Sequence, residues 1–317
     1  MLGFVYAGQG SQRVGMGQDF YDKYSSFRST IDNATEVVSK VTDMDLADVS
    51  FNGPMEQLSS TEYTQPAMVA FAIGVTKLLK EAGIDADYTC GLSLGEYSAL
   101  YEAGVVDEAT IMALIAKRGK YMAEASKGLN VKMAAVLGMD RETVLECCEK
   151  ASAATEGERV VQAANFNCPG QIVISGHSSA VDKASVFLKE AGAKRILPLK
   201  VSGPFHTKLM KPAGDKLAEE FKAVDFKDEK TKVVYNCLGR EKNTAENVAE
   251  LLEKQVQSSV YLEDSIRYMA EAGVDTFVEI GPGKAISKFI TKTLENAKVY
   301  SIDTVDDFEN LVKELGA

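Results

Sequence analysis

The strongest local signal in the sequence is a serine with a glycine two residues before it and another two residues after it, Gly91-x-Ser93-x-Gly95. An extended run precedes this motif at 87–90, and a helical run follows it at 96–103. G-x-S-x-G between a strand and a helix is typical of a nucleophile elbow, whose serine is strained and whose glycines let strand and helix pass closely. The motif therefore predicts an α/β fold with Ser93 as a candidate nucleophile. A chance match is the alternative, because serine and glycine are common residues.

The composition is that of an enzyme-sized protein with a large core. Of the 317 residues, 45% are hydrophobic and 26% are charged, which is enough to bury one large core and one smaller lobe. The formal net charge of -11 argues against nucleic acid or an anionic membrane as a partner, since both bind clustered cationic side chains. The longest apolar run, 67–75, is too short to span a bilayer.

The N-terminus and the cysteines indicate a reducing compartment. The first three residues lead directly into a strand without the pattern of a signal peptide. The five cysteines are odd in number and lack a paired metal-binding spacing. We therefore expect a cytoplasmic protein with reduced thiols and no bound metal.

The chain opens with a buried strand at 2–7 and a glycine-containing loop at 8–12. A dinucleotide-binding fingerprint is a poor match here, because its third glycine is displaced to Gly15 and no acidic residue follows on a second strand. Such a loop can instead present a backbone N–H to an oxyanion, together with the N–H of Leu94 after the candidate nucleophile. A plain turn is the alternative.

A cation lies on the apolar face of the predicted helix 108–124, where Arg118 shares a stripe with Ile111, Leu114, Ile115 and Met122. A guanidinium on an inward face needs a carboxylate or phosphate partner, because an unpaired buried charge costs several kcal/mol. An internal salt bridge or a snorkelling side chain would satisfy this need. A bidentate clamp for an anionic substrate would satisfy it too.

The middle of the chain has the pattern of a separate small lobe. After a linker at 126–130, the order strand, helix, strand, strand, helix, strand is predicted at 133–137, 141–153, two strands around 167–170, 181–191 and 195–199. This order is the ferredoxin-like split βαβ unit. Further strands at 232–236, 276–280 and 298–302 alternate with helices at 244–256, 261–272, 284–295 and 305–315. Together with a long helix from Gln65-Pro66 to Gly83, they predict a mostly parallel sheet covered on both faces.

One of the two histidines is suited to activate Ser93. His206 follows the return from the small lobe and lies on a loop, whereas His177 is poorly placed at the start of a helix. Neutral imidazole is the side chain that takes a serine proton near pH 7, so His206 is the candidate base by elimination. Spacing alone leaves the third member of a triad open, since neither Asp215 nor Glu279 is an obvious partner.

Six blocks, in the same order along the chain, resemble one known family. They are 8–12, the elbow with Glu96, Arg118 within 117–120, 165–167 with 169–171, 204–206 and 281–283. Together they resemble the malonyl-CoA:acyl carrier protein transacylases. The resemblance implies an α/β-hydrolase-like large subdomain (1–127 and 201–317), a ferredoxin-like small subdomain (128–200) and an active site in the groove between them.

The resemblance also implies catalytic roles. Ser93 would be acylated, His206 would be the base, and the backbone carbonyl of Gln255 would orient the histidine. The N–H groups of Gln9 and Leu94 would form the oxyanion hole, with Gln9 also among the substrate-binding residues. A backbone carbonyl in place of an acid would explain why no acidic triad member is apparent.

Four further residues are implied in substrate binding. Arg118 would grip the malonyl carboxylate, and Asn165 and Met122 would line the pocket. Phe205 resembles the malonyl-selecting form of its block, in which a bulky ring crowds an α-methyl group and disfavours methylmalonyl by about 1–3 kcal/mol. Leu92 departs from the family, which usually has histidine directly before the nucleophile.

The resemblance implies ping-pong transfer of malonyl from malonyl-CoA to acyl carrier protein through a malonyl-serine ester, without metal or redox cofactor. We expect a monomer; the fatty acid or polyketide pathway stays open. Candidate docking residues for the acidic carrier are Lys189, Lys194, Arg195, Lys208, Lys211, Lys284 and Lys288, unless they are simply solvated. Two other functions stay open: a serine hydrolase or thioesterase, and a non-catalytic module that binds acyl-CoA or carrier protein.

Overall fold

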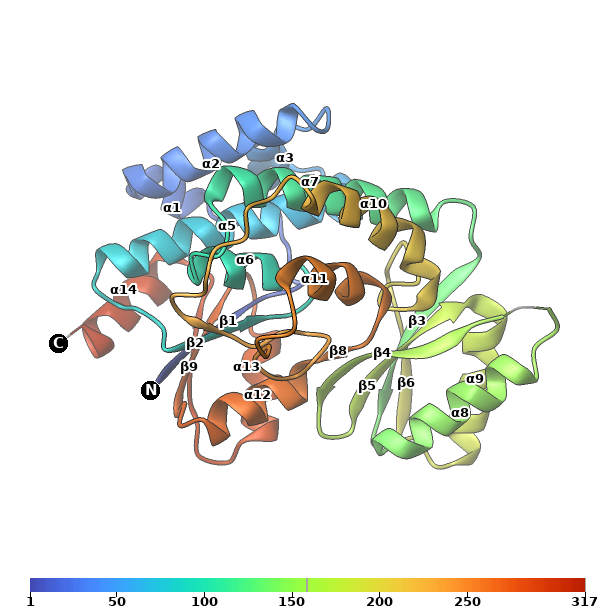
Figure 1. Cartoon of the computed structure of the whole chain (residues 1–317). Coiled ribbons are helices and arrows are strands. Elements are labelled where there is room, and N and C mark those ends of the chain that lie inside the picture. Colours follow the sequence, from blue (N-terminus) through green and yellow to red (C-terminus); the bar gives the residue numbers. More distant parts are fainter. Residues whose placement is uncertain (158, 317) are drawn as a thin grey trace.

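Two β-sheets organise the chain, and the computed structural model describes residues 1–157 and 159–316 (Figure 1). The larger sheet has the order β10-β9-β1-β2-β7, and its strand pairs are parallel. Its strands are β1 (Leu2–Tyr6), β2 (Tyr88–Gly91), β7 (Lys232–Val233), β9 (Thr276–Ile280) and β10 (Lys298–Ile302).

Helices bury both faces of this sheet, as expected for parallel strands. Phe4 and Tyr6 of β1 pack in one core cluster with α5 (Thr61–Glu81), α6 (Gly95–Glu102) and α7 (Glu108–Ser126), and Val5 packs in another with α12 (Leu262–Glu271) and α13 (Ala285–Thr293). In Figure 1 these two groups of helices lie on opposite sides of the sheet. The predicted α/β fold class is thus confirmed.

Eight short and long helices complete the large subdomain. The N-terminal helices pack outside α5. The others come after the small sheet in the sequence, and the last of them ends the chain. They are α1 (Gln18–Lys23), α2 (Ser25–Ser39), α3 (Leu46–Asn52), α4 (Met55–Leu58), the 3-10 turn η1 (Lys208–Met210), α10 (Lys211–Phe221), α11 (Val248–Gln257) and α14 (Val305–Leu315). None of the helices in the described ranges is long and apolar enough to cross a membrane.

The predicted start of α5 is wrong. The helix begins at Thr61, and Pro66 lies inside it rather than in its first turn. Proline removes one backbone hydrogen bond from a helix interior. Here every residue from 64 to 76 is buried, so packing on all sides offsets that loss.

The smaller sheet confirms the ferredoxin-like prediction. Its order is β6-β3-β5-β4-β8, and the first four strands are antiparallel. Its elements are β3 (Val131–Leu137), α8 (Arg141–Ala153), β4 (Val161–Cys168), β5 (Gln171–His177), α9 (Ser178–Glu190) and β6 (Arg195–Leu199). The fifth strand, β8 (Val260–Tyr261), comes from the large subdomain and pairs with β4. The boundaries at 128 and 200 stay a prediction.

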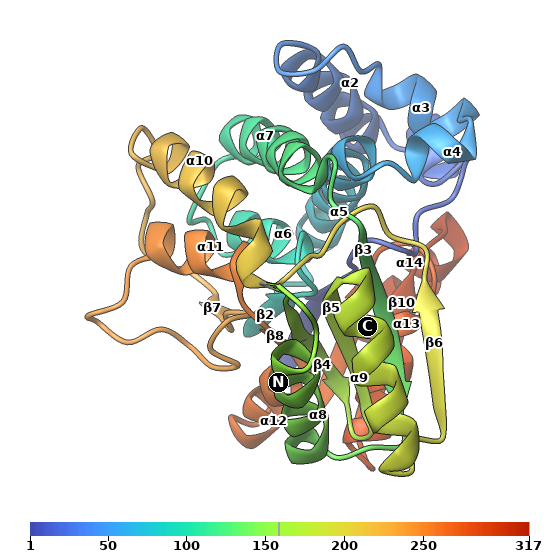
Figure 2. The same cartoon turned by 90° about the vertical axis from the view of Figure 1, so that its right-hand side faces the viewer.

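The two faces of the small sheet have different neighbours. Ala134 and Val136 of β3 pack with α8 and α9, which lie in front of the sheet in Figure 2. Met133 and Ala135 point the other way and belong to the core cluster of the large subdomain. This inner face therefore forms one wall of the space between the subdomains.

Two predicted boundaries after β6 are also wrong. The strand predicted at 232–236 pairs only over Lys232–Val233, because Tyr235 turns to bridge with Arg240 and Asn236 leaves the sheet. The helix predicted at 244–256 begins only at Val248. The Asn247 side chain accepts the Glu250 N–H and so caps the N-terminus of this helix.

Candidate active site

The serine motif forms the predicted elbow between β2 and α6. A Cβ on Gly91 would lie 2.1 Å from the Gly95 carbonyl carbon, and a Cβ on Gly95 would lie 2.4 Å from the Tyr6 carbonyl oxygen. Only glycine fits at these two positions. Ser93 itself has φ of 56°, a left-handed conformation that is strained for a residue with a side chain.

Ser93 and His206 are in direct contact. The Ser93 Oγ lies 2.8 Å from His206 Nε2, and His206 Nδ1 lies 2.9 Å from the backbone oxygen of Gln255. An N–H at Nδ1 donating to that carbonyl leaves Nε2 free to accept the serine proton. His206 has φ of 59°, and within 1–157 and 159–316 it and Ser93 are the only non-glycine residues with positive φ.

His206 is held in the neutral form. Burial, and then the positive charge of Arg118, lower the pKa of His206 to about 4. The imidazole is therefore an unprotonated acceptor at neutral pH, which is the state required of a general base.

Arg118 is a buried cation that lacks a carboxylate at ion-pair distance within the described part of the chain. Its guanidinium is 0% exposed and donates to Gln65 Oε1 at 2.6 Å, to Gln255 Oε1 at 3.0 Å and to Ser93 Oγ at 3.1 Å. It also lies 5.5 Å from the centre of the Tyr97 ring, a cation–π distance. All of these partners are neutral, so the charge stays unbalanced.

The buried carboxyl nearest in sequence to the elbow does not balance this charge. Burial raises the pKa of Glu96 to about 8 against the opposing effects of Asn236 and Arg118, so its protonated form prevails at neutral pH. Glu96 Oε2 accepts the Asn236 N–H at 2.7 Å. The arrangement leaves a positive site beside the Ser93 hydroxyl that suits an anion.

A cavity of about 570 Å³ opens at this point between the two subdomains. Eight of the nine predicted site residues line it: Gln9, Ser93, Leu94, Arg118, Met122, Asn165, Phe205 and His206. Gln255 lies behind Ser93 and His206. In the described ranges neither the Gln9 N–H nor the Leu94 N–H donates a hydrogen bond, so both are available to a developing oxyanion.

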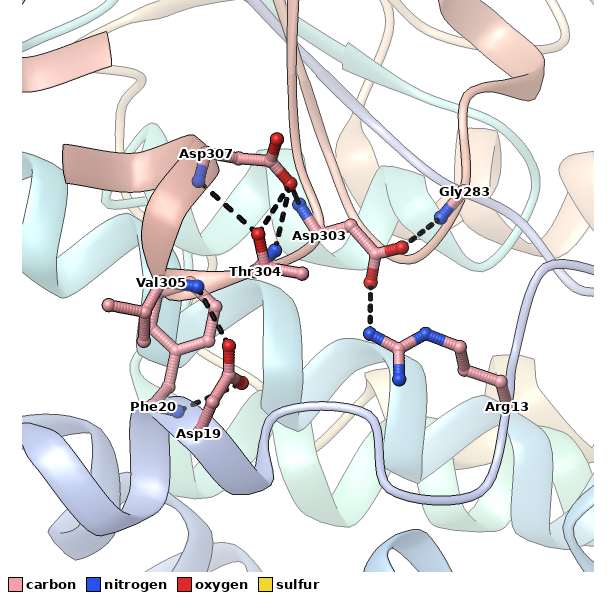
Figure 3. A network of polar contacts seen from close by, with 8 residues as sticks. All are labelled: Arg13, Asp19, Phe20, Gly283, Asp303, Thr304, Val305 and Asp307. Atoms are coloured by element: carbon pink, nitrogen blue, oxygen red, sulfur yellow. Dashed lines mark hydrogen bonds and ion pairs between the residues drawn. The ribbon is translucent and has the colours of Figure 1, made fainter. Parts of the chain in front are cut away.

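The loop that carries Gln9 is anchored at both sides. Gln9 Nε2 donates to Thr61 Oγ1 at 3.2 Å, at the start of α5. Figure 3 shows Asp303 accepting from Arg13 Nη2 at 2.8 Å and from the Gly283 N–H at 3.1 Å. The loop after β1 is thereby tied to the loop after β9.

The remaining predicted residues form the walls. Met122 faces Gln65, whose Nε2 lies 3.4 Å from the methionine sulfur. Phe205 is 7% exposed. Leu92 lines the cavity and abuts Gly8, where a Cβ would lie 2.9 Å from Leu92 Cγ. At this position the chain therefore presents an apolar wall.

Neither of the two acids considered as triad members contacts His206, although Glu279 lines the cavity. Glu279 accepts from the N–H groups of Ile286 and Ser287 at the start of α13. Asp215 pairs with Lys211 one turn away on α10. Neither is a partner of His206, whose Nδ1 faces a backbone carbonyl.

Sequence reasoning missed Gln65 and Asn236. Gln65 holds Arg118, and Asn236 accepts the Ser93 N–H at 2.7 Å and donates to the Gly91 carbonyl at 2.6 Å. Neither residue lies in a motif, so no local signal distinguishes it. Among residues 1–157 and 159–316, no group of three His, Cys, Asp or Glu side chains is placed to hold a metal ion.

A serine on a strand-to-helix elbow, in contact with a neutral buried imidazole, is the arrangement of serine-dependent acyl-transfer enzymes, which include hydrolases and transferases. Comparison with known proteins narrows this class. Residues 3–309 match the acyl transferase domain family. The chain is 40% identical to the malonyl CoA-acyl carrier protein transacylase of Bacillus subtilis over 314 residues, 99% of this chain and 97% of that protein.

Solved structures agree with this result. The chain is similar to the crystal structure of MCAT from Streptococcus pneumoniae, with a TM-score of 0.92, 43% identity, and coverage of 99% of this chain and 100% of that one. It is also similar to a malonyl-transacylase solved with a type II PKS acyl-carrier protein, with a TM-score of 0.92, 33% identity and 99% coverage of both chains. The chain belongs to the malonyl CoA-acyl carrier protein transacylase family of acyltransferases.

Proposed function

We propose that this protein transfers a malonyl group from malonyl-CoA to the phosphopantetheine thiol of an acyl carrier protein, through an ester on Ser93. The observation that carries the proposal is the unbalanced Arg118 charge 3.1 Å from the Ser93 hydroxyl. A dicarboxylic thioester has a carboxylate at one end and a reactive carbonyl near it. The guanidinium and the hydroxyl are spaced to engage both.

In the first half of the reaction, His206 Nε2 takes the Ser93 proton as the oxygen attacks the thioester carbonyl. The carbonyl oxygen gains negative charge and is bound by the N–H groups of Gln9 and Leu94. When the carbonyl re-forms, the C–S bond breaks and the coenzyme A sulfur leaves with the proton from His206. A malonyl-serine ester remains, with its free carboxylate on Arg118.

In the second half, the carrier's thiol enters the same cavity. His206 takes the thiol proton, the sulfur attacks the ester carbonyl, and the same two N–H groups bind the oxyanion. The C–O bond to Ser93 then breaks, and the serine oxygen recovers the proton from His206. Gln255 keeps the imidazole oriented through its backbone carbonyl, 2.9 Å from Nδ1.

Arg118 distinguishes this proposal from a serine hydrolase. A hydrolase would use the same serine, histidine and oxyanion loop but would not need a cation beside the nucleophile. By holding the carboxylate, Arg118 also fixes the ester so that only a delivered thiol is well placed to attack. Comparing hydrolysis with transfer from the same malonyl-CoA separates the two activities.

Intact-mass analysis after mixing with malonyl-CoA tests the proposal directly. We expect the wild-type chain to gain one malonyl group and Ser93→Ala to gain none. Ser98→Ala is the matched control, because Ser98 is a buried serine of α6 whose hydroxyl has no partner among the described residues. It should form the adduct as the wild type does. An absent wild-type adduct, or one that survives Ser93→Ala, favours a non-catalytic binding module.

We also infer where the carrier protein docks. Lys284 directly precedes Ala285, and Lys288 directly precedes Phe289; both of these neighbours line the cavity. The two lysines are therefore the best placed of the basic side chains named above to meet an acidic carrier. Charge reversal at Lys288 should raise KM for the carrier but not for malonyl-CoA.

We infer a monomer in the cytoplasm, without metal or redox cofactor. All five cysteines are free and buried, which fits a reducing compartment. No step of the proposed transfer requires an electron carrier or a Lewis acid. Sedimentation at working concentration tests the monomer, and activity after treatment with a chelator tests the second point.

A further inference from the structure

Asn236 makes two hydrogen bonds to the backbone of the elbow from a distant part of the chain. Its side-chain Oδ1 accepts the Ser93 N–H at 2.7 Å, and its Nδ2 donates to the Gly91 carbonyl at 2.6 Å. One amide therefore bridges the last residue of β2 and the strained serine. Asn236 is 1% exposed, so these bonds face little competition from water.

Asn236 is itself fixed by two neighbours. Its backbone N–H donates to Glu96 Oε2 at 2.7 Å, and Gln255 Nε2 lies 3.4 Å from its Oδ1. Gln255 Nε2 also donates to the Ser93 carbonyl oxygen at 2.7 Å. Glu96 lies on α6, the helix that directly follows the elbow. The hydrogen bonds of Asn236 therefore link the strand before the elbow, the serine within it and the helix after it.

This network bears on reactivity because the elbow is strained. A left-handed serine backbone persists only where surrounding contacts impose it. The peptide groups on either side of Ser93 are those that must turn to relax it. Asn236 holds the first through the Ser93 N–H, and Gln255 holds the second through the Ser93 carbonyl oxygen. The bonds also direct the Ser93 N–H to Asn236, which leaves the Leu94 N–H to serve the oxyanion.

We propose that Asn236 is a positioning residue that holds the elbow in the conformation from which the Ser93 hydroxyl reaches His206, and that Glu96 fixes Asn236 in this place. The inference rests on the proposed role of Ser93 as nucleophile. It adds to the reaction a residue that touches neither substrate nor the reacting atoms.

Single-turnover acylation by malonyl-CoA, followed by rapid quench and mass analysis of the full chain, tests this role. Asn236→Ala should lower the maximal acylation rate by about 10- to 100-fold, the cost of a nucleophile displaced by an ångström or less. The half-saturating malonyl-CoA concentration should change by less than about twofold, because Arg118 is untouched. The rate at which a fluorophosphonate reagent without a carboxylate modifies Ser93 should fall by the same factor.

Cys237→Ala is the matched control for a general loss of packing. It removes a buried side chain from the next residue of the same loop, and its thiol makes only a weak contact, 3.7 Å to the Leu251 carbonyl. We expect lower stability in denaturant but an acylation rate near that of the wild type. The proposal is overturned if Asn236→Ala acylates within about twofold of the wild type, or if Cys237→Ala loses as much. A wild-type chain that forms no adduct refutes the proposed function instead.

Asn236→Asp gives a readout that packing alone would not change. A protonated carboxyl at this position can accept from Ser93 and donate to Gly91, whereas an ionised one cannot donate. Among the titratable and charged groups near position 236, Glu96 of α6 accepts its backbone N–H, and Arg118 of α7 and His206 both contact Gln255, whose Nε2 lies 3.4 Å from the Asn236 Oδ1. Tyr235 and Cys237 are its neighbours in the chain, and Cys90 precedes the Gly91 carbonyl that it binds.

Between about pH 5 and about pH 7, His206 stays neutral and Glu96 stays protonated, because their pKa values are about 4 and about 8. Burial raises the pKa of a carboxyl at position 236, so its protonated fraction grows as pH falls. The acylation rate of Asn236→Asp should therefore rise toward that of the wild type as pH falls from 7 to 5. A rate that stays as low as that of Asn236→Ala throughout contradicts the proposal.

Discussion

Replacing Arg118 by glutamine should cost transfer of malonyl far more than transfer of acetyl. Arg118→Gln removes the buried charge but keeps a polar group that can contact Gln65. A carboxylate about 4 Å from the guanidinium carbon, in a site with an effective dielectric constant of about 20, gains about 4 kcal/mol from the charge. At about 1.4 kcal/mol per decade, that is a loss of about 10³-fold in kcat/KM for malonyl-CoA. Acetyl-CoA has no carboxylate and should lose little.

The assay measures kcat/KM for both thioesters with the same carrier protein, together with hydrolysis of the acyl-enzyme. The ratio of malonyl to acetyl transfer is the informative quantity, since a misplaced nucleophile lowers both. Lys120→Gln is the matched control, because it makes the same charge change on an exposed position of α7. The reasoning is refuted if Arg118→Gln lowers kcat/KM for malonyl-CoA and acetyl-CoA by the same factor, or if Lys120→Gln changes the ratio of the two as strongly.

Three further predictions follow from the same geometry. The acylation rate should fall as pH drops through about 4, because that is the lowered pKa of His206. In the unfolded chain this imidazole binds a proton already below about pH 6.5, so the free energy of unfolding should decrease below that pH, as denaturant titrations would show. Phe205→Ala should reduce the preference for malonyl over methylmalonyl by about 1–3 kcal/mol, measured as the ratio of kcat/KM values. Asp303→Ala should loosen the Gln9 loop and lower kcat by less than about tenfold, with Asp306→Ala as a silent control.

Local patterns predicted much of the site. The spacing of Gly91, Ser93 and Gly95 reports a steric requirement, because each glycine faces backbone too close for a Cβ. His206 could be found by elimination because the chain has only two histidines. Arg118 could be singled out because a cation on an apolar stripe needs an explanation. The glycine spacing and the apolar stripe around Arg118 record constraints that act within a few residues, whereas His206 could be found only because there are so few histidines.

The missed features depend on contacts between distant segments. Asn236 and the carbonyl that it binds are 145 residues apart, and one asparagine after a short strand is an unremarkable turn residue in sequence. For the same reason the observed strand β7 is shorter than the strand predicted at 232–236, since the chain leaves the sheet where Asn236 turns toward the elbow. The start of α5 was misplaced because the general preference of proline for a first turn yields to packing when the whole helix is buried.

The active site concentrates features that oppose folding. Ser93 and His206 have strained backbones, Arg118 is buried without a counter-ion, and Glu96 is buried with one oxygen unpartnered in the described ranges. A carboxylate at Glu96 could have neutralised Arg118, but burial favours its protonated form and it bonds instead to Asn236. The protein thus keeps the positive charge for a ligand and uses the nearby acid to support the elbow. An anionic substrate would supply the missing counter-ion, so substrate binding would itself offset the cost of the buried, unpaired Arg118 charge.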